Sequence, residues 1–520
     1  MRRAILSPLI VLCLLTATPT WAQPSGGELS VVLSSLSSEA LDPILAGHIV
    51  KFYLSLMFDY LVGATPDGQL SPDGGVATRW ETSADGKRWT FHLRRGVRFH
   101  TGDELTAEDV KVSIVRALGP RSTTGYAQGL RQLVKEIETP APDRVVIVTK
   151  DASVMIPTLL SRLLSTEGMI LPKKYLEAKG DDGFARAPVG SGPYRFVEQV
   201  SGSHVRLEAV PSHWRLGAPK YKTVVFKAVP EETTRIAMLR RGEADVVEIS
   251  RERMKEVEHA GYTVHLRRED GQIEGWFVQP WSQTPIRDKR VREALNLAID
   301  RKELAETVFG GQAAPAAVPF GLSWSFPEIK FKITPEMVYA YDPGRAKKLL
   351  ADAGYANGFA IDVFAFQLPG FPEGRAMAEA IAGYWQNVGL KPRLIPVDYP
   401  AFRKQWFDRT APGALGYYNI ANRDWIGTYA LIDKYAAPTA KSASIRDPEL
   451  DGLMDALIHQ PDREKTYALM RSIFNRLRTE HLGLPLVYYH TPYATSKRIP
   501  RWNPGAVMYE LNIDEVVAGK

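Results

Sequence analysis

The stretch Gly190–Gln199, GSGPYRFVEQ, combines glycines and serine in a way that could cradle a phosphate or present a nucleophile. A phosphate loop needs a helix directly after its glycines, so that backbone N–H groups and the helix dipole face the anion. A nucleophile elbow needs Gly-x-Ser-x-Gly ahead of a helix. Here Pro193 removes a backbone donor, and side chains alternate from Tyr194 onward. We therefore interpret the stretch as the entry to a β-hairpin that turns at residues 201–203.

The ten histidines and the 59 acidic residues show no catalytic or metal-binding spacing. The sequence contains no His-Glu-x-x-His pair, no Walker motif and no dinucleotide fingerprint. His481 and His490 stand nine residues apart beside a strand-like segment, a pattern typical of a surface or a domain boundary. We predict no catalytic residue, no metal and no cofactor. A hydrolase that assembles Glu and His residues in a cleft stays open as an alternative, because catalytic triads are spatial.

The first 22 residues have the features of a secretory signal peptide. Arg2 and Arg3 precede an apolar run, and small residues stand at the cleavage positions around Trp21, which favours cleavage after Ala22. The only cysteine, Cys13, lies inside this segment and follows Leu12, which argues against a lipoprotein site. A mature chain without cysteine has neither disulfides nor thiolate metal sites and must be stabilised by packing.

The composition excludes two classes of protein. Removing Arg2 and Arg3 leaves 63 basic against 59 acidic residues, a balance of +4, and the basic residues are not clustered. A nucleic-acid-binding stripe requires such clustering, so we predict no nucleic-acid partner. With 45% hydrophobic and 10% aromatic residues, the chain is well suited to packing and is not typical of disorder. A mature length near 500 residues favours two or three domains.

Local patterns predict an α/β protein. Gly27–Ser34 alternates as a strand, and Asp85–Gly86 turns a hairpin. Thr106 and Asp109 are spaced as a capping box before a helix that ends at Gly119. In the second half of the chain, aspartates precede helical stripes at positions 288, 300 and 342, and short strands follow them. Helices that alternate with strands at this spacing predict a parallel-rich α/β lobe there.

Four stretches, in this order along the chain, resemble the extracellular solute-binding proteins of family 5, the peptide, dipeptide and nickel receptors of ABC importers. They are WETSADGKRWTFHLRRGVRFHTGDELTAEDVKVSI (Trp80–Ile114), GSGPYRFVEQVSGSHVRLEAVPSHW (Gly190–Trp214), TPIRDKRVREALNLAIDRKEL (Thr284–Leu304) and YDPGRAKKLLADAGY (Tyr341–Tyr355). Together they extend over most of the mature chain.

The resemblance implies a two-lobe periplasmic binding protein fold of type II, in the large class with an extra subdomain on lobe 1. Lobe 1 is then expected at residues 23–49, 171–281 and 491–520, the extra subdomain at 50–170, and lobe 2 at 282–490. The chain would cross between the lobes twice, and a hinge rotation would enclose the ligand.

The resemblance also implies where the ligand binds. The stretch ALGYYNIANRDWIGTY (414–429) lines the cleft in relatives, and in peptide-binding relatives an aspartate three residues after an aromatic pairs with the α-ammonium group of the peptide. Counted from Tyr417, this position holds Ile420, which puts peptide binding in doubt. A shifted Asp424 could replace the carboxylate, Arg423 could bind a ligand carboxylate, or the two could simply pair with each other. The candidate ligand-binding residues are Glu39, Trp406, Tyr417, Asn419, Arg423, Asp424 and Trp425.

The resulting functional hypothesis is a monomeric periplasmic receptor without catalytic activity. It would capture a short peptide or another small polar organic solute and deliver it to an ABC permease and ATPase at the membrane. A ligand-binding co-receptor for signalling is the second hypothesis, and a periplasmic hydrolase is the third.

Overall fold

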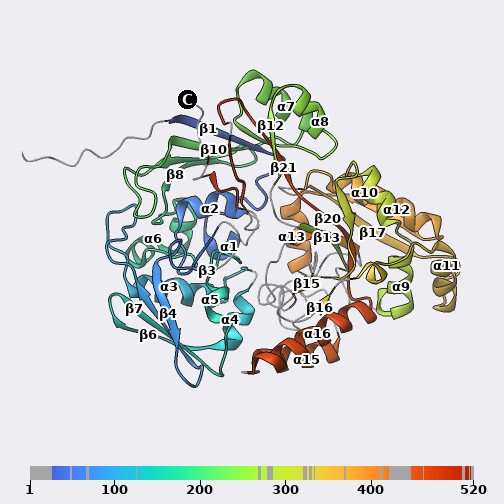
Figure 1. The fold of residues 1–520 in the computed structure, drawn as a ribbon, viewed down its shortest axis with the longest axis horizontal. Coiled ribbons are helices and arrows are strands. Elements are labelled where there is room, and N and C mark those ends of the chain that lie inside the picture. The colour runs from blue at the N-terminus through green and yellow to red at the C-terminus, as the bar shows by residue number, and fades with distance from the viewer. Residues whose placement is uncertain are drawn as a thin grey trace, which may run out of the picture.

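The computed structural model describes most of the chain after residue 25. The described residues are 26–46, 50–65, 70–124, 126–164, 166–266, 271–277, 285–319, 325–326, 331–332, 334–367, 371–408, 410, 414–420, 432, 447–460, 462–499, 501–505, 510–513 and 516. Two lobes lie side by side, with the N-terminal half of the chain on one side and most of the C-terminal half on the other (Figure 1).

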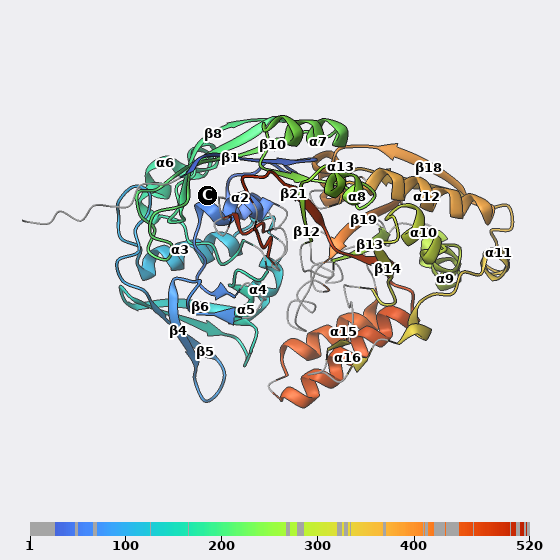
Figure 2. The same ribbon diagram turned by 45° about the horizontal axis from the view of Figure 1, so that its top comes forward.

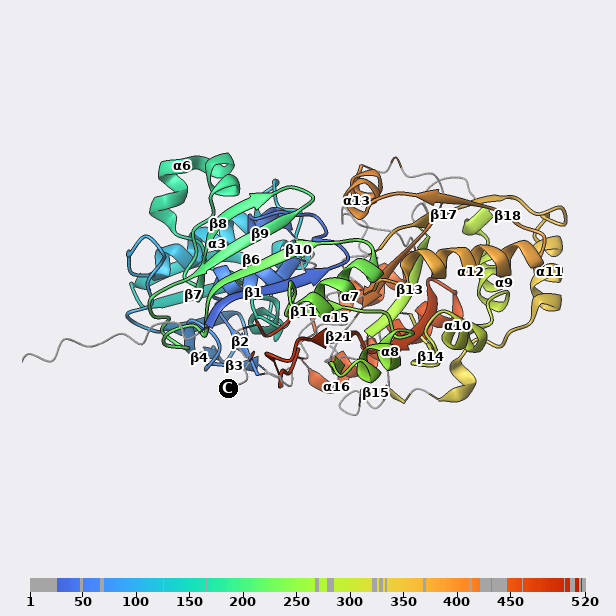
Figure 3. The same cartoon turned by 90° about the horizontal axis from the view of Figure 1, so that it is seen from above.

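The first lobe is built on a seven-stranded mixed sheet in the order β12-β21-β11-β1-β10-β9-β8 (Figure 3). Central strand β1 pairs in parallel with β10 and β11, whereas β8, β9, β12 and β21 are joined by antiparallel pairings. The strands are β1 (Gly26–Leu33), β8 (Tyr194–Val200), β9 (His204–Ala209), β10 (Tyr221–Ala228), β11 (Val246–Glu248), β12 (Thr263–Leu266) and β21 (Pro492–Thr495).

Both faces of this sheet are covered, because consecutive side chains of β1 point to opposite faces and those from Leu29 to Leu33 are all buried. Val31 belongs to a buried cluster with residues of α2 (Lys51–Met57), while the neighbouring Val32 packs with Ile236 on the opposite face. Helices α7 (Glu232–Arg241) and α8 (Met254–His259) contribute to that second cluster. Short helix α1 (Pro43–Ala46) lies just before α2.

An extra subdomain follows β1 and its helices. Its four-stranded antiparallel sheet has the order β4-β5-β7-β6. The strands are β4 (Ala77–Thr82), β5 (Arg88–Leu93), β6 (Val134–Ala141) and β7 (Arg144–Thr149), with β2 (Gly63–Ala64) and β3 (Leu70–Ser71) before them. The neighbouring helices are α3 (Ala107–Leu118), α4 (Ala127–Leu133), α5 (Ile156–Leu159) and α6 (Lys173–Arg186).

The second lobe contains a six-stranded sheet in the order β14-β20-β13-β19-β17-β18. Its strands are β13 (Gly271–Phe277), β14 (Ala313–Pro315), β17 (Ala360–Ala365), β18 (Lys391–Pro396), β19 (Ala414–Ile420) and β20 (Leu484–Tyr489). Only the β17–β18 and β17–β19 pairs are parallel; the other three pairs are antiparallel. The expectation of a parallel-rich lobe is therefore wrong, because β13 and β20 are the strands that enter from and return to lobe 1.

Helices surround the six-stranded sheet and share its core. They are α9 (Lys289–Leu297), α10 (Arg301–Thr307), α11 (Pro343–Asp352), α12 (Gly374–Asn387), α13 (Tyr399–Phe407), α15 (Pro448–Ile458) and α16 (Arg463–Thr479). Smaller elements are the 3-10 turns η2 (Pro285–Arg287) and η3 (Pro335–Met337) and the strand pair β15 (Ser325–Phe326) and β16 (Phe331–Lys332). Trp385 is fully buried here, and its Nε1 donates to the Leu295 carbonyl.

The two large sheets lie in different lobes (Figure 2), and the order of the strands along the chain requires two passages between them. The first passage falls between Leu266 at the end of β12 and Gly271 at the start of β13, which is earlier than the boundary at residue 281 expected from the sequence. The reason is that β13 pairs with β19 and β20, inside the second lobe. The second passage falls between Tyr489 of β20 and Pro492 of β21.

Candidate functional site between the lobes

The loop at Gly190–Pro193 has a structural role. Ser191 is buried, and its hydroxyl donates to Asp59 Oδ2 at 2.9 Å, while Trp214 Nε1 donates to the same oxygen at 2.9 Å. His213 Nε2 lies 3.2 Å from the other carboxylate oxygen. The Ser191 hydroxyl therefore donates its hydrogen bond to a carboxylate inside the protein and is not presented to a substrate. The strands β8 and β9 pair as the hairpin that the sequence predicted.

Burial raises the pKa of Asp59, but the charge of His213 and the hydrogen bonds from His213, Trp214 and Ser191 outweigh it, so the pKa of Asp59 lies below its usual value. The carboxylate thus stays ionised and holds three segments of lobe 1 together. Ser191, Asp59 and His213 are all buried, so this polar cluster is part of the scaffold.

The segment after β1 has two residues with left-handed backbone. Ser37 and Glu39 have φ values of 60° and 53°, which non-glycine residues adopt only when the surroundings hold them there. The Glu39 carboxylate accepts hydrogen bonds from Ser201 Oγ at 2.7 Å and from the Gly202 N–H at 2.8 Å. The structure thus places this candidate ligand-binding residue against the turn of the β8–β9 hairpin.

Two serine hydroxyls in the same segment are buried without a hydrogen bond. Ser34 and Ser37 are almost inaccessible to solvent, and neither Oγ has a partner among the described residues. They lie at the carboxyl end of β1, the end of a sheet strand where ligands bind in open α/β sheets. This end of lobe 1 therefore offers two hydroxyl groups whose hydrogen bonds a ligand could complete.

On the second lobe, strand β19 carries two of the candidate residues. Tyr417 pairs with Gly275 and Asn419 with Ile273 of β13, and Ile420 ends the strand opposite Gln272. β19 lies between β13 and β17, so its carboxyl end lies near the middle of the sheet edge. Arg423, Asp424 and Trp425 follow directly and lie outside the described residues.

Trp406 lies in the core of the second lobe. Its side chain in α13 is 2% exposed, and its ring packs 5.7 Å from Phe402 and 5.7 Å from Phe407. Phe402 continues this cluster to Phe364 of β17. In this conformation the indole supports the sheet beneath the site and is not open to a solute.

A contact that the sequence did not indicate joins the two lobes beside the second passage. Arg251 follows β11 in lobe 1, and its Nη1 lies 2.6 Å from Oε1 of Glu373, which precedes α12 in lobe 2. The guanidinium carbon also lies 4.0 Å from the Tyr489 ring centre and 5.3 Å from that of Phe309. Nothing in residue spacing could have identified this pair, because 122 positions separate its members.

The lobes also touch at a distance from this passage. Arg403 Nη2 of α13 donates to the Thr123 carbonyl in the first half of the chain at 3.2 Å. His459, at the end of α15, has its Nε2 3.6 Å from Asp151 Oδ2 of the extra subdomain. Contacts on both sides of the interlobe region describe a closed arrangement of the lobes.

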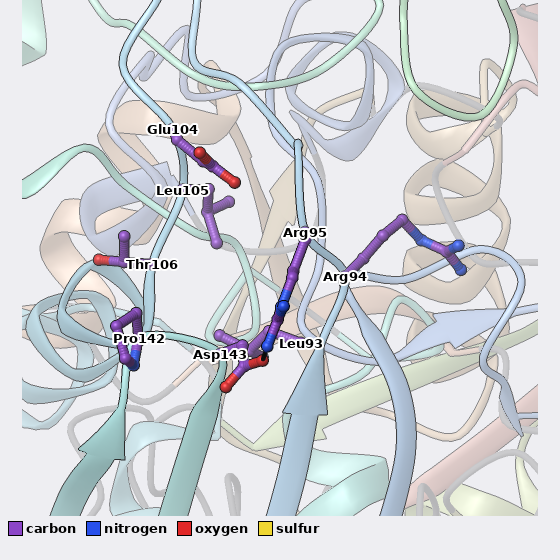
Figure 4. Close-up of a pocket in the computed structure, with 8 residues that line it drawn as sticks. All are labelled: Leu93, Arg94, Arg95, Glu104, Leu105, Thr106, Pro142 and Asp143. Carbon is purple, nitrogen blue, oxygen red and sulfur yellow. Dashed lines mark hydrogen bonds and ion pairs between the residues drawn. The ribbon is translucent and has the colours of Figure 1, made fainter.

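A cavity of about 240 Å³ lies in the extra subdomain, not between the lobes. It is lined by Leu93, Arg94, Arg95, Glu104, Leu105, Thr106, Pro142 and Asp143 (Figure 4). Arg95 reaches across to Asp143 at 2.6 Å, whereas Arg94 points away and stacks on Trp214 at 4.6 Å. Arg95 and Asp143 are paired with each other, Glu104 Oε1 accepts a hydrogen bond from the Gly96 N–H, and none of the candidate residues lines the cavity.

The described part of the chain contains neither a metal cluster nor a membrane-spanning helix. No group of three or more His, Cys, Asp or Glu side chains there has the arrangement of a metal site. Likewise, no helix among the described residues is both long enough and apolar enough to cross a membrane.

Comparison with known proteins agrees with this architecture. The sequence profile of the bacterial extracellular solute-binding proteins, family 5 Middle, matches residues 71–445. The chain is 28% identical to Heme-binding protein A of Haemophilus influenzae over 77% of this chain and 76% of that protein. It is also 28% identical to the dipeptide-binding protein of Escherichia coli, over 70% and 69% of the two chains.

Among solved structures, AgaA from A. tumefacien R10 in complex with agropinic acid superposes with a TM-score of 0.81 at 22% identity, covering 95% of this chain and 99% of AgaA. The fold is therefore the two-lobe periplasmic binding protein fold of type II. Since the profile spans well over half of the residues, the chain belongs to family 5 of the bacterial extracellular solute-binding proteins.

Proposed function

We propose that this chain is the substrate-binding protein of an ABC importer, released into the periplasm after removal of residues 1–22. It captures a short peptide or another small polar organic solute between its lobes. It then delivers this solute, chemically unaltered, to the membrane permease. The division proposed for the mature chain is lobe 1, an extra subdomain within residues 50–170, and lobe 2, with the first boundary near residues 267–270.

The observation that carries the proposal is the interlobe architecture. Among the described strands, the chain passes between the two sheets at two points, after β12 and after β20, and the lobes meet again at Arg403 and His459. A body of this kind opens and closes by a rotation at the passages. Closure strips a solute of water and lets placed polar groups decide which solute is held.

The proposed ligand contacts come from both lobes. In lobe 1 they are Glu39 and the segment around it, whose Ser34 and Ser37 hydroxyls are buried without a partner in the described structure. In lobe 2 they are Tyr417, Asn419 and the residues that follow β19, namely Arg423, Asp424 and Trp425. Trp406 supports this surface from the core.

The ligand class follows from the residue that ends β19. Ile420 offers no charge to an α-ammonium group, so recognition of a free peptide N-terminus is not expected at this position. Relatives carry names that refer to heme and to dipeptides, and AgaA was solved with agropinic acid, so membership of the family does not by itself fix the ligand. We favour a polar solute recognised through carboxylate, hydroxyl or amide groups.

A thermal-shift screen on ligand-stripped protein tests the proposal. The screen compares free dipeptides, the same dipeptides with an acetylated N-terminus, and opine-type sugar–amino acid conjugates. A bound solute at 100 times its Kd should stabilise the protein by about 2.7 kcal/mol. Since Ile420 supplies no carboxylate, acetylation should change a dipeptide's shift little.

Small-angle scattering on the same samples provides the second measurement. Addition of any solute that raises the unfolding temperature should reduce the radius of gyration, because the lobes close on it. Two results would contradict the proposal: a stabilising solute that leaves the radius unchanged, or recovery of the solute in chemically altered form by mass spectrometry.

A further inference from the structure

Arg251 of lobe 1 is inserted into a socket formed by lobe 2. We define the socket by Phe309, Phe371, Tyr489 and Glu373. The three ring centres lie 6.0 to 6.1 Å apart from one another, and Phe309 and Phe371 are fully buried. The Arg251 guanidinium stacks on Tyr489 and Phe309 and pairs with Glu373.

The socket adjoins the second passage between the lobes. Tyr489 is the last residue of β20, and Pro492, three residues later, begins β21 and accepts a hydrogen bond from the Ile249 N–H through its carbonyl. Arg251 is two residues beyond Ile249. A rotation at this passage therefore acts directly on the contact between Arg251 and the socket.

The ion pair in the socket is buried but only partly satisfied. The side chains of Arg251 and Glu373 are 0% and 5% exposed. Arg251 Nε and Nη2 and Glu373 Oε2 are buried and have no hydrogen bond within the described structure. A buried charge that lacks part of its hydrogen bonds destabilises the state in which it is buried, and a paired charge can still cost more in lost hydration than it gains.

We propose that the buried pair of Arg251 and Glu373 opposes closure of the empty protein. This inference rests on the proposed function, because it treats the closed arrangement as one end of a working motion. When the lobes open, water can hydrate both charges, whereas closing removes that water and leaves three polar atoms without partners. The pair thereby keeps the unloaded protein open until ligand contacts elsewhere in the interlobe region drive closure.

Distance measurements between two spin labels test this in the ligand-free protein. The only cysteine of the chain is Cys13, within the predicted signal segment, so labels can be attached at Glu136→Cys on β6 and Ala468→Cys on α16, both exposed. Ligand is removed by unfolding, dialysis and refolding. The replacement of both charges by Arg251→Met with Glu373→Leu should raise the ratio of closed to open molecules about tenfold, since an apolar pair loses no hydration on closing.

Single and control variants sharpen the test. Arg251→Met alone leaves the Glu373 carboxylate to be buried without its cation, so the closed fraction should fall below that of the unmodified protein. The pair Lys289 and Glu480 lies within lobe 2 at 3.0 Å, and Lys289→Met with Glu480→Leu should leave the distances unchanged. If the apolar pair does not fold, Arg251→Gln with Glu373→Gln removes the same charges and should shift the ratio in the same direction.

The inference is overturned if the ligand-free protein is already closed, or if the double variant has the same distance distribution as the unmodified protein. The second result would mean that the contact persists during opening or serves only to hold the fold. Failure of the proposed function is distinguishable, because it would be seen as the absence of any stabilising solute in the thermal screen, whatever the spin labels report.

Discussion

At the residue scale, the most informative side chain against the Gly190–Pro193 loop is His100, which comes from the extra subdomain. Its Nδ1 accepts a hydrogen bond from the Gly190 N–H at 3.3 Å, and its Nε2 lies 2.9 Å from the Gly192 carbonyl, to which it donates. This arrangement requires the neutral ring, with its proton on Nε2. Burial lowers the pKa of His100 to about 4, in agreement with the geometry.

We predict that the protein loses stability as the pH falls from about 6.5 toward 4. In this range the unfolded chain takes up a proton on His100 that the folded protein does not accept, so acidification favours unfolding. The loss from His100 should be on the order of 2 kcal/mol. His481 has a pKa lowered to about 4 by burial and contributes in the same direction.

Urea unfolding at pH 7 and pH 4.5 measures this effect, with His100→Gln as the control. A glutamine side chain can still accept a hydrogen bond from the Gly190 N–H and donate one to the Gly192 carbonyl, but it does not titrate. The stability of the variant should therefore fall less than that of the unmodified protein between the two pH values. An equal loss in both proteins would show that His100 does not control the acid response.

Other residues mark the limit of what sequence reasoning can reach. The hairpin turn at 201–203 was predictable because alternation is a local pattern. The partner of that turn, the Glu39 carboxylate, was not, since it lies 162 and 163 positions away from the two donors. The Arg251–Glu373 pair is equally remote from any local signal, and the pair forms only because two lobes meet.

At the scale of elements, the N-cap residues recognised in the sequence predicted correctly where four helices begin. Asp288, Asp300 and Asp342 each accept backbone N–H groups at the start of α9, α10 and α11, and Thr106 with Asp109 forms the capping box of α3. Strand direction in the second lobe was not predictable in the same way. It depends on β13 and β20, whose partners are decided by the crossings between lobes and not by local periodicity.

Gly190 lets the loop before β8 lie directly against the end of α2, which a residue with a Cβ atom would prevent. A Cβ at this position would lie 2.0 Å from the Met57 carbonyl oxygen and 2.7 Å from Phe58 Cδ1, and the backbone contact has no room to yield. Gly190→Ala should therefore destabilise the protein by about 3 kcal/mol or more. The reason is steric and does not involve a phosphate or a nucleophile.

The matched control is Gly383→Ala in α12. A Cβ there meets nothing within 4 Å, and the residue is exposed within a helix, so the change should stabilise the protein by about 0.5–1 kcal/mol. Thermal unfolding of the two variants should shift in opposite directions. A well-tolerated Gly190→Ala would mean that the loop can move away from the end of α2.

At the scale of the whole molecule, Glu510 in the C-terminal segment joins α2 to the extra subdomain. Lys51 Nζ lies 3.3 Å from Glu510 Oε1, and Arg162 Nε lies 2.5 Å from Glu510 Oε2. Lys51 and Glu510 are almost completely buried, and Lys51 also donates to the Arg162 carbonyl at 2.6 Å. Such a cluster holds lobe 1 and the subdomain as one body, which a rotation about the passages requires.

Glu510→Ala should destabilise this body by about 3–5 kcal/mol, because Lys51 and Arg162 would lose the carboxylate that pairs with them. The loss should be smaller in Lys51→Met with Glu510→Leu, since Arg162 is 14% exposed and can reach water. Hydrogen exchange measured by mass spectrometry locates the effect: peptides of β1, α2 and β10 should lose protection, while those of α12 and β17 should not. Uniform loss of protection in both lobes would contradict the assignment of this cluster to one body, and with it the mechanical separation on which capture between the lobes depends.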